Sequence, residues 1–275
     1  MVETCLWQEA AVQRLTVLLQ SDPEVLALAV FGSYLQSQSH LDIWSDLDFL
    51  VVVKDGTMER FYPAMDWLTP LGMVYAYEQS ANAFRNTTRL CFEDLRRIDL
   101  VLTTESGLER DEDWARLPFW RGVKVLFCRW ARLEKALSRT FEQPEPSPVP
   151  PERFEMMANR YWFKGVMAVQ KVARNDLLIA YHLALEMVQD CCILGMMLRD
   201  RAEGTHHHRE GEIGNQLVPE LASTRHPPTA LGILALIEES SAVFDGLAAQ
   251  WSDGTQERRH PLLAWIRQAR ETALS

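Results

Sequence analysis

Two short motifs in the first fifty residues combine residue types that could bind a metal ion and phosphate. An apolar run over residues 25–31 ends in Gly32-Ser33, and after twelve further residues Asp46-x-Asp48 opens a second, β-branched run. Two carboxylates at positions i and i+2 of a strand point to the same face. Carboxylate oxygens are ligands that Mg²⁺ prefers, and a metal ion held there could bridge the phosphates of a nucleotide.

A third carboxylate, Asp99, lies between apolar residues in another strand-like run, where an unpartnered charge would be costly to bury. If the two strands are neighbours, Asp46, Asp48 and Asp99 converge on one spot. Two divalent ions roughly 4 Å apart can use such a cluster to activate an attacking oxygen and to neutralise leaving pyrophosphate. Gly32 would allow close approach of the triphosphate, and backbone amides with the Ser33 hydroxyl would hold its oxygens.

The alternative is a purely structural role for the same residues. Asp46 and Asp48 would then cap a strand, and Asp99 would pair with Arg96 or Arg97. An isolated Asp-x-Asp is common, whereas its combination with a strand-terminal Gly-Ser and a third strand carboxylate is not. We therefore favour the functional interpretation.

The elements that must position these residues follow from hydrophobic periodicity and turn signals in the first half of the chain. We expect helices over residues 3–20, 58–68 and 131–141, strands over residues 25–31, 47–53, 71–77 and 123–127, and a hairpin of residues 89–96 with 97–102. Helices mixed with a small sheet place this half in the α+β class.

Five prolines mark residues 142–152 as an extended linker, because proline at that density continues neither a helix nor a central strand. Beyond it the pattern is helical, with segments at residues 154–171, 176–201, 230–251 and 261–274. We therefore expect a catalytic domain over residues 1–141 and an all-α helical bundle over residues 153–275 that binds an acceptor.

Composition limits the partners. The 275 residues carry a net charge of −10, which argues against nucleic acid as the main partner. The five cysteines fit neither a zinc site nor a disulfide framework, as expected of free thiols in a reducing cytoplasm. We find no signal-peptide pattern and no apolar run of membrane-spanning length, so we expect a cytoplasmic protein without a membrane partner.

The spacing of Gly32-Ser33, Asp46-x-Asp48 and a distant Asp99 resembles the signature of the DNA polymerase β-like nucleotidyltransferase superfamily. The resemblance implies a small mixed sheet and Mg²⁺-dependent transfer of a nucleoside monophosphate with release of pyrophosphate. In that reading Asp46 and Asp48 hold the metal against the triphosphate. Asp99 completes a second metal site or acts as the general base on the acceptor hydroxyl.

The segment Phe92–Leu100 is similar to the Phe-Glu-Asp-Gly-x-Arg-Ile-Asp-Leu segment of aminoglycoside 6-adenylyltransferases. Those enzymes join their catalytic domain to a C-terminal helical bundle. In the second half of this chain, motifs of that bundle are resembled by Tyr161-Trp162-Phe163 and by the later Lys171 and Arg174. The resemblance implies ATP as donor and an aminoglycoside-like antibiotic as the small hydroxylated acceptor. It also connects the chain with antibiotic resistance.

Two positions depart from that family. Tyr34 follows Gly32-Ser33 where the family tends to carry arginine, and Leu95 replaces a glycine in the hairpin turn. Because the arginine is missing, triphosphate contacts pass to Arg97, Lys171 or Arg174, with Arg89 as a further candidate.

Glu186 is a second candidate for the general base, because an acidic residue amid apolar residues on a bundle helix is unusual. A solvent-facing or salt-bridged Glu186 is the alternative, since charged helix residues are usually exposed. Two other functions stay open: nucleotidylation of a protein partner, and a non-catalytic nucleotide-binding or antitoxin-like module. The acceptor, the preferred NTP, the choice of base and a homodimeric state are also left open by the sequence.

Overall fold

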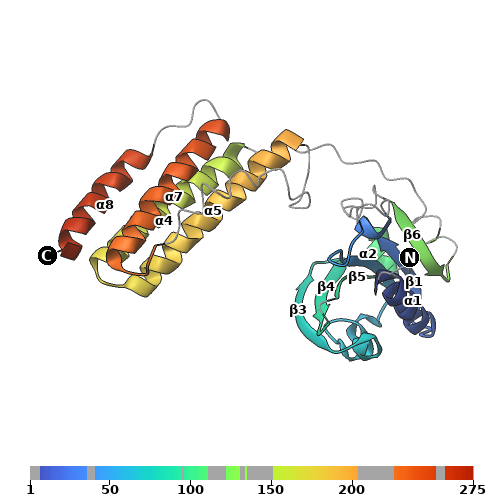
Figure 1. Cartoon of the computed structure of the whole chain (residues 1–275). Helices are drawn as coiled ribbons and strands as arrows, with labels where there is room; N and C mark the ends of the chain where they lie inside the picture. The colour runs from blue at the N-terminus through green and yellow to red at the C-terminus, as the bar shows by residue number, and fades with distance from the viewer. Residues whose placement is uncertain are drawn as a thin grey trace, which may run out of the picture. The chain divides into compact units, whose positions relative to one another are not determined.

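The structure is a computed structural model, shown in Figure 1. It describes residues 7–35, 41–94, 96–110, 122–130, 134, 151–203, 226–251 and 258–274. The chain divides into two compact units, the N-terminal unit (residues 1–144) and the helical unit (residues 145–275). Residues 142–150 of the expected linker 142–152, and nearly all of the expected helix 131–141, lie outside the described residues.

The N-terminal unit contains one six-stranded sheet in the order β3-β4-β5-β2-β1-β6. Its strands are β1 (Val25–Phe31), β2 (Leu47–Val53), β3 (Val74–Ala81), β4 (Arg85–Phe92), β5 (Arg97–Thr104) and β6 (Val123–Cys128). β2 and β5 pair in parallel, and the other neighbouring pairs are antiparallel. The sheet is therefore mixed, which confirms the expected α+β class.

Both faces of the sheet centre are covered, which explains why β1 and β2 read as nearly continuous apolar runs. Helix α1 (Trp7–Gln20) packs Leu15 and Leu19 against the side that contains Phe49. On the opposite side Leu50 and Val101 pack with Leu108 of the short helix α2 (Glu105–Arg110). The strands that carry the candidate site are thus fixed by the core of this unit.

The expected helix at 58–68 is wrong. The structure has two short 3₁₀ helices there, η2 (Met58–Arg60) and η3 (Asp66–Leu71). Pro63 lies between them, and a proline inside an α-helix removes a backbone hydrogen bond and clashes with the preceding turn. The next strand begins at Val74 rather than residue 71, after Gly72 has taken a φ of 143° that L side chains rarely adopt.

The helical unit contains four described helices, α4 (Pro151–Ala173), α5 (Leu177–Glu203), α7 (Ala230–Trp251) and α8 (Arg259–Leu274), as Figure 1 shows. Contacts join α4 with α5, α7 and α8, α5 with α7, and α7 with α8. The expected helical bundle is confirmed. α4 begins at Pro151, so the last two residues of the expected linker belong to this helix, where proline suits the first turn.

Contrary to the expectation that no apolar run reaches membrane-spanning length, the segment Leu177–Arg199 of α5 is long and apolar enough to span a membrane by length and composition. Its buried residues, among them Ala184, Met187 and Leu194, pack in the core of the helical unit. We therefore interpret α5 as a core helix. The four described cysteines, Cys91, Cys128, Cys191 and Cys192, are free.

Candidate active site

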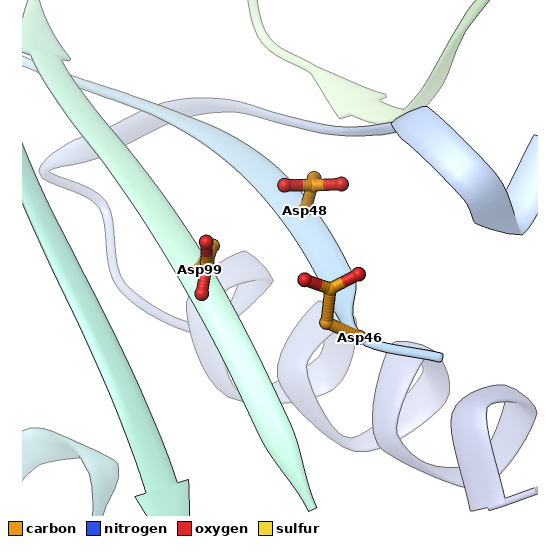
Figure 2. Close-up of side chains that lie close together, drawn as sticks. All are labelled: Asp46, Asp48 and Asp99. Carbon is orange, nitrogen blue, oxygen red and sulfur yellow. The ribbon is translucent and has the colours of Figure 1, made fainter. Parts of the chain in front are cut away.

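The parallel pairing of β2 with β5 places Asp48 directly opposite Asp99. Asp46 lies one residue before the start of β2, two residues from Asp48, and its side chain turns to the same place (Figure 2). One carboxylate oxygen from each of the three residues lies within 4.8 Å of the other two. We call Asp46, Asp48 and Asp99 the acidic triad.

Gly32 stands next to the acidic triad, because β1 pairs antiparallel with β2 and places Phe31 opposite Asp48. The φ of Gly32 is 76°, in the left-handed region that favours glycine. A Cβ at this position would lie 2.2 Å from Oδ2 of Asp48. The glycine is therefore required twice, for its backbone conformation and for the space that the Asp48 carboxylate fills.

Ser33 follows in a short 3₁₀ helix (Gly32–Leu35) at the end of β1. Its Oγ is buried and has no hydrogen-bond partner among the described residues. A buried hydroxyl without a partner is uncommon, because it loses its hydrogen bonds to water. A phosphate oxygen bound beside the acidic triad would supply the missing partner.

The acidic triad is mostly withdrawn from solvent. Asp48 is 6% exposed, and the side chains of Asp99 and Asp46 are 13% and 25% exposed. Three carboxylates so close together repel one another unless cations stand near them. The chemistry of this donor set, all carboxylate oxygens, fits a hard divalent cation such as Mg²⁺.

Two arginines contact the acidic triad. Arg97 donates a hydrogen bond from Nη2 to Oδ2 of Asp46, and its Nε lies 3.6 Å from Oδ1 of Asp99. Arg89 lies opposite Asp99 in the β4–β5 hairpin, with Nε 3.4 Å from Oδ2 of Asp99 and Nη1 3.3 Å from Glu78. The structural alternative considered above is thus partly present, since Asp99 does pair with Arg97.

Arg96, the other partner considered for Asp99, points elsewhere. Its Nε donates to Asp94 at 2.6 Å and its Nη2 to the backbone carbonyl of Leu71 at 2.8 Å. This ion pair lowers the pKa of Asp94, with the hydrogen bond from Arg96 as the largest cause. Arg96 therefore holds the hairpin turn against the end of η3.

The loop that leads into Asp46 is held by helix α1. Gln8 is fully buried, and its Nε2 donates to the carbonyls of Asp42 and Ser45 at 2.7 and 3.0 Å. Trp7 donates from its indole nitrogen to the carbonyl of Ile43. Within the loop Asp42 accepts hydrogen bonds from Trp44 and Ser45, and those from Ser45 chiefly lower the pKa of Asp42. These contacts fix the chain immediately before Asp46.

Three of the candidate residues, Lys171, Arg174 and Glu186, belong to the helical unit. Lys171 forms an ion pair at 2.8 Å with Asp176 across the turn between α4 and α5, where Asn175 has a φ of 58°. Arg174 is exposed in the same turn. The contact of Lys171 is therefore one that stabilises the helix–helix turn.

Glu186 is salt-bridged. Its carboxylate lies 3.1 Å from Nζ of Lys164 and 3.1 Å from Nε2 of His182. The hydrogen bond from Lys164 is the main reason why the pKa of Glu186 is lowered. A carboxylate with a lowered pKa accepts a proton less readily, so this environment does not favour a general base.

Comparison with known proteins identifies the family. The family model of streptomycin adenylyltransferase matches residues 8–201, which include Gly32, Ser33 and the whole acidic triad. No curated protein matches the chain. Among solved structures the chain is similar to an aminoglycoside 6-adenyltransferase from Bacillus subtilis, with 14% identity and a TM-score of 0.44, over 94% of this chain and 98% of that one.

The match to the family model covers most of the chain and confirms the resemblance seen in the Phe92–Leu100 segment. The chain belongs to the streptomycin adenylyltransferase family and is a nucleotidyltransferase.

Proposed function

We propose that this enzyme transfers AMP from ATP to a hydroxyl group of a small acceptor, an aminoglycoside-like antibiotic, with release of pyrophosphate. The observation that carries the proposal is the convergence of the three carboxylates of the acidic triad within 4.8 Å, beside Gly32-Ser33. Such a cluster suits phosphoryl chemistry, in which charge must be neutralised on both the attacking and the leaving oxygens. Membership of the family supports the nucleotidyl transfer and the choice of donor and acceptor.

In this proposal Asp46 and Asp48 hold Mg²⁺, and Asp99 completes the metal site. The metal ion, when bound, would stabilise charge on the triphosphate and on the attacking oxygen. The acceptor oxygen forms a bond to the α-phosphorus while the bond to pyrophosphate breaks. The hydroxyl proton passes to a carboxylate oxygen of Asp99.

We choose Asp99 rather than Glu186 as the general base. Asp99 belongs to the acidic triad, whereas Glu186 is engaged with Lys164 and His182 in the helical unit and has a lowered pKa. Glu186 then has a structural or acceptor-orienting role.

The phosphates would be held by the Gly32-Ser33 turn and by Arg97. The unpartnered hydroxyl of Ser33 supports the first assignment, and the closeness of Arg97 to the acidic triad supports the second. Lys171 is engaged by Asp176, so we assign it a structural role and keep Arg174, which is exposed, as the phosphate candidate of the helical unit.

We further propose that the unit of residues 1–141 is the catalytic domain and that the helical bundle binds the acceptor. A net charge of −10 suits an acceptor that carries several ammonium groups. The free cysteines are compatible with a cytoplasmic enzyme.

A pyrophosphate-release screen tests the proposal. The purified chain is incubated with Mg²⁺, each of the four NTPs, and a panel of aminoglycosides, lincosamides and a cell extract. We expect release with ATP and an aminoglycoside. Asp48→Asn should lose at least a hundredfold in rate, and Asp66→Asn, an exposed carboxylate of η3, should match wild type. Full turnover by Asp48→Asn would refute the mechanism. Transfer of the nucleotide to a protein of the cell extract would refute the small acceptor.

A further inference from the structure

Arg97 spans two members of the acidic triad. Its Nη2 donates to Asp46 and its Nε lies 3.6 Å from Asp99, from a side chain that is 57% exposed. The guanidinium therefore binds the same two carboxylates that the proposed function assigns to the metal. A planar guanidinium with five donors suits such a contact better than a lysine ammonium would.

The charges explain why an arginine is needed there. The acidic triad contributes three negative charges within 4.8 Å, and Arg97 with Arg89 contributes two positive charges. The three carboxylates alone carry a charge of −3, and the carboxylates together with the two arginines carry −1. The arginines thus relieve the mutual repulsion of the carboxylates, as a bound cation would.

The two arginines differ in how many contacts hold them at the acidic triad. Arg89 is held from both sides, by Glu78 at 3.3 Å and by Asp99 at 3.4 Å. Among the described residues, both ion pairs of Arg97 are with members of the acidic triad. A divalent ion on Asp46 and Asp99 would compete for those oxygens and repel the guanidinium within a few ångströms.

We propose that Arg97 is an internal counter-ion of the acidic triad, which a divalent metal displaces from Asp46 and which then binds the triphosphate. This inference rests on the proposed function. Phosphate oxygens form strong, frequently bidentate hydrogen bonds with arginine, so the displaced side chain gains a new partner when nucleotide is present. Metal alone must break the Arg97–Asp46 contact without that gain. Metal and nucleotide therefore bind with positive coupling.

The first test is the affinity for Mn²⁺ alone, measured by electron paramagnetic resonance without nucleotide. Arg97→Gln should bind Mn²⁺ roughly tenfold tighter than wild type, which corresponds to about 1.4 kcal/mol. Arg97→Lys, which keeps the charge, should show a smaller increase in the same direction. The matched control is Arg60→Gln. Arg60 pairs with Asp22, which precedes the start of β1, whereas Asp48 lies opposite Phe31 at the end of that strand.

The second test is the affinity for ATP with Mg²⁺, measured by calorimetry without acceptor. Arg97→Gln should bind MgATP roughly tenfold more weakly, although it binds the metal alone more tightly. Circular dichroism verifies that each variant is folded. If Arg97→Gln does not fold, Arg97→Lys carries both comparisons.

The outcomes separate the two claims. Equal or weaker Mn²⁺ binding by Arg97→Gln overturns the displacement, and unchanged MgATP affinity overturns the transfer of Arg97 to the phosphates. In either case a wild type that binds Mn²⁺ and loses it in Asp48→Asn keeps the proposed function intact. If neither wild type nor Arg97→Gln binds Mn²⁺, both the inference and the proposed metal site fail.

Discussion

Gly32→Ala is the substitution whose consequence the structure fixes most closely. The new Cβ would stand 2.2 Å from Oδ2 of Asp48, whereas non-bonded heavy atoms rest about 3.5 Å apart. The Asp48 carboxylate, which belongs to the acidic triad, must therefore move by roughly 1 Å. A displacement of that size in a catalytic group can reduce the rate about a hundredfold.

The same substitution also has a backbone cost. The φ of Gly32 is 76°, and an L residue in the left-handed region is destabilised by about 1–2 kcal/mol. Gly56→Ala isolates this cost, because Gly56 has a φ of 80° and a Cβ there would meet nothing within 4 Å. The two variants therefore share the backbone penalty, and they differ in the contact with Asp48.

The assays are urea unfolding for stability and Mn²⁺ binding with pyrophosphate release for the site. Both variants should lose about 1–2 kcal/mol of unfolding free energy. Gly32→Ala alone should lose metal affinity and about a hundredfold in rate. A Gly32→Ala enzyme with wild-type metal affinity and rate would refute the reasoning, as would an equal loss of activity in Gly56→Ala.

Three further outcomes follow from the contacts. Gln8→Leu leaves the carbonyls of Asp42 and Ser45 without their donor, so the free energy of unfolding should fall by about 1–3 kcal/mol and Mn²⁺ binding should weaken. Gln13→Leu, at an exposed position of the same helix, should show neither effect. Equal effects in both variants would contradict the account. The lowered pKa of Glu186 means that its ionised form stabilises the fold above its unfolded pKa of about 4.3, and that this contribution is lost as the pH falls through the still lower folded value. Thermal melts should therefore show wild type above Glu186→Gln at pH 6 and the gap closing by pH 3; a gap independent of pH would disprove the ion pair's contribution. Burial raises the pKa of Cys191 to about 12, so Cys191 should react slowly with a thiol reagent at pH 8. The number of rapidly reacting thiols should therefore fall by one in Cys192→Ser and stay unchanged in Cys191→Ser. Rapid labelling of Cys191 in the folded protein would rule out its burial.

Much of the N-terminal unit could be predicted because its strands carry strong local signals. The apolar runs at residues 25–31 and 47–53 bury both faces, so their composition reveals them without tertiary information. The helix expected at 58–68 fails for a local reason, since Pro63 interrupts a segment whose apolar spacing alone is typical of a helix.

The contacts of Arg89 could have been found from the hairpin. A tight turn between Phe92 and Arg97 fixes the register of the two strands, and counting back from it pairs Arg89 with Asp99. The parallel pairing of Asp48 with Asp99 is different, because no turn links β2 to β5. The carboxylates indicated only that the three side chains would converge if the two strands were neighbours, and the parallel pairing itself was not predicted.

Gln8 left only a faint signal. It shares the buried stripe of α1 with Val12, Leu15 and Leu19, and a polar residue on such a stripe implies a hydrogen-bond partner. The partners, Asp42 and Ser45, are more than thirty residues away, and no local pattern identifies them.

The most direct test of the central claim follows the nucleotide itself. ATP labelled in the α-phosphate is incubated with Mg²⁺ and an aminoglycoside, and the products are separated by chromatography. We predict label on the aminoglycoside with wild type and Asp66→Asn, and none with Asp48→Asn. Label transferred at the wild-type rate by Asp48→Asn would contradict an active site built on the acidic triad.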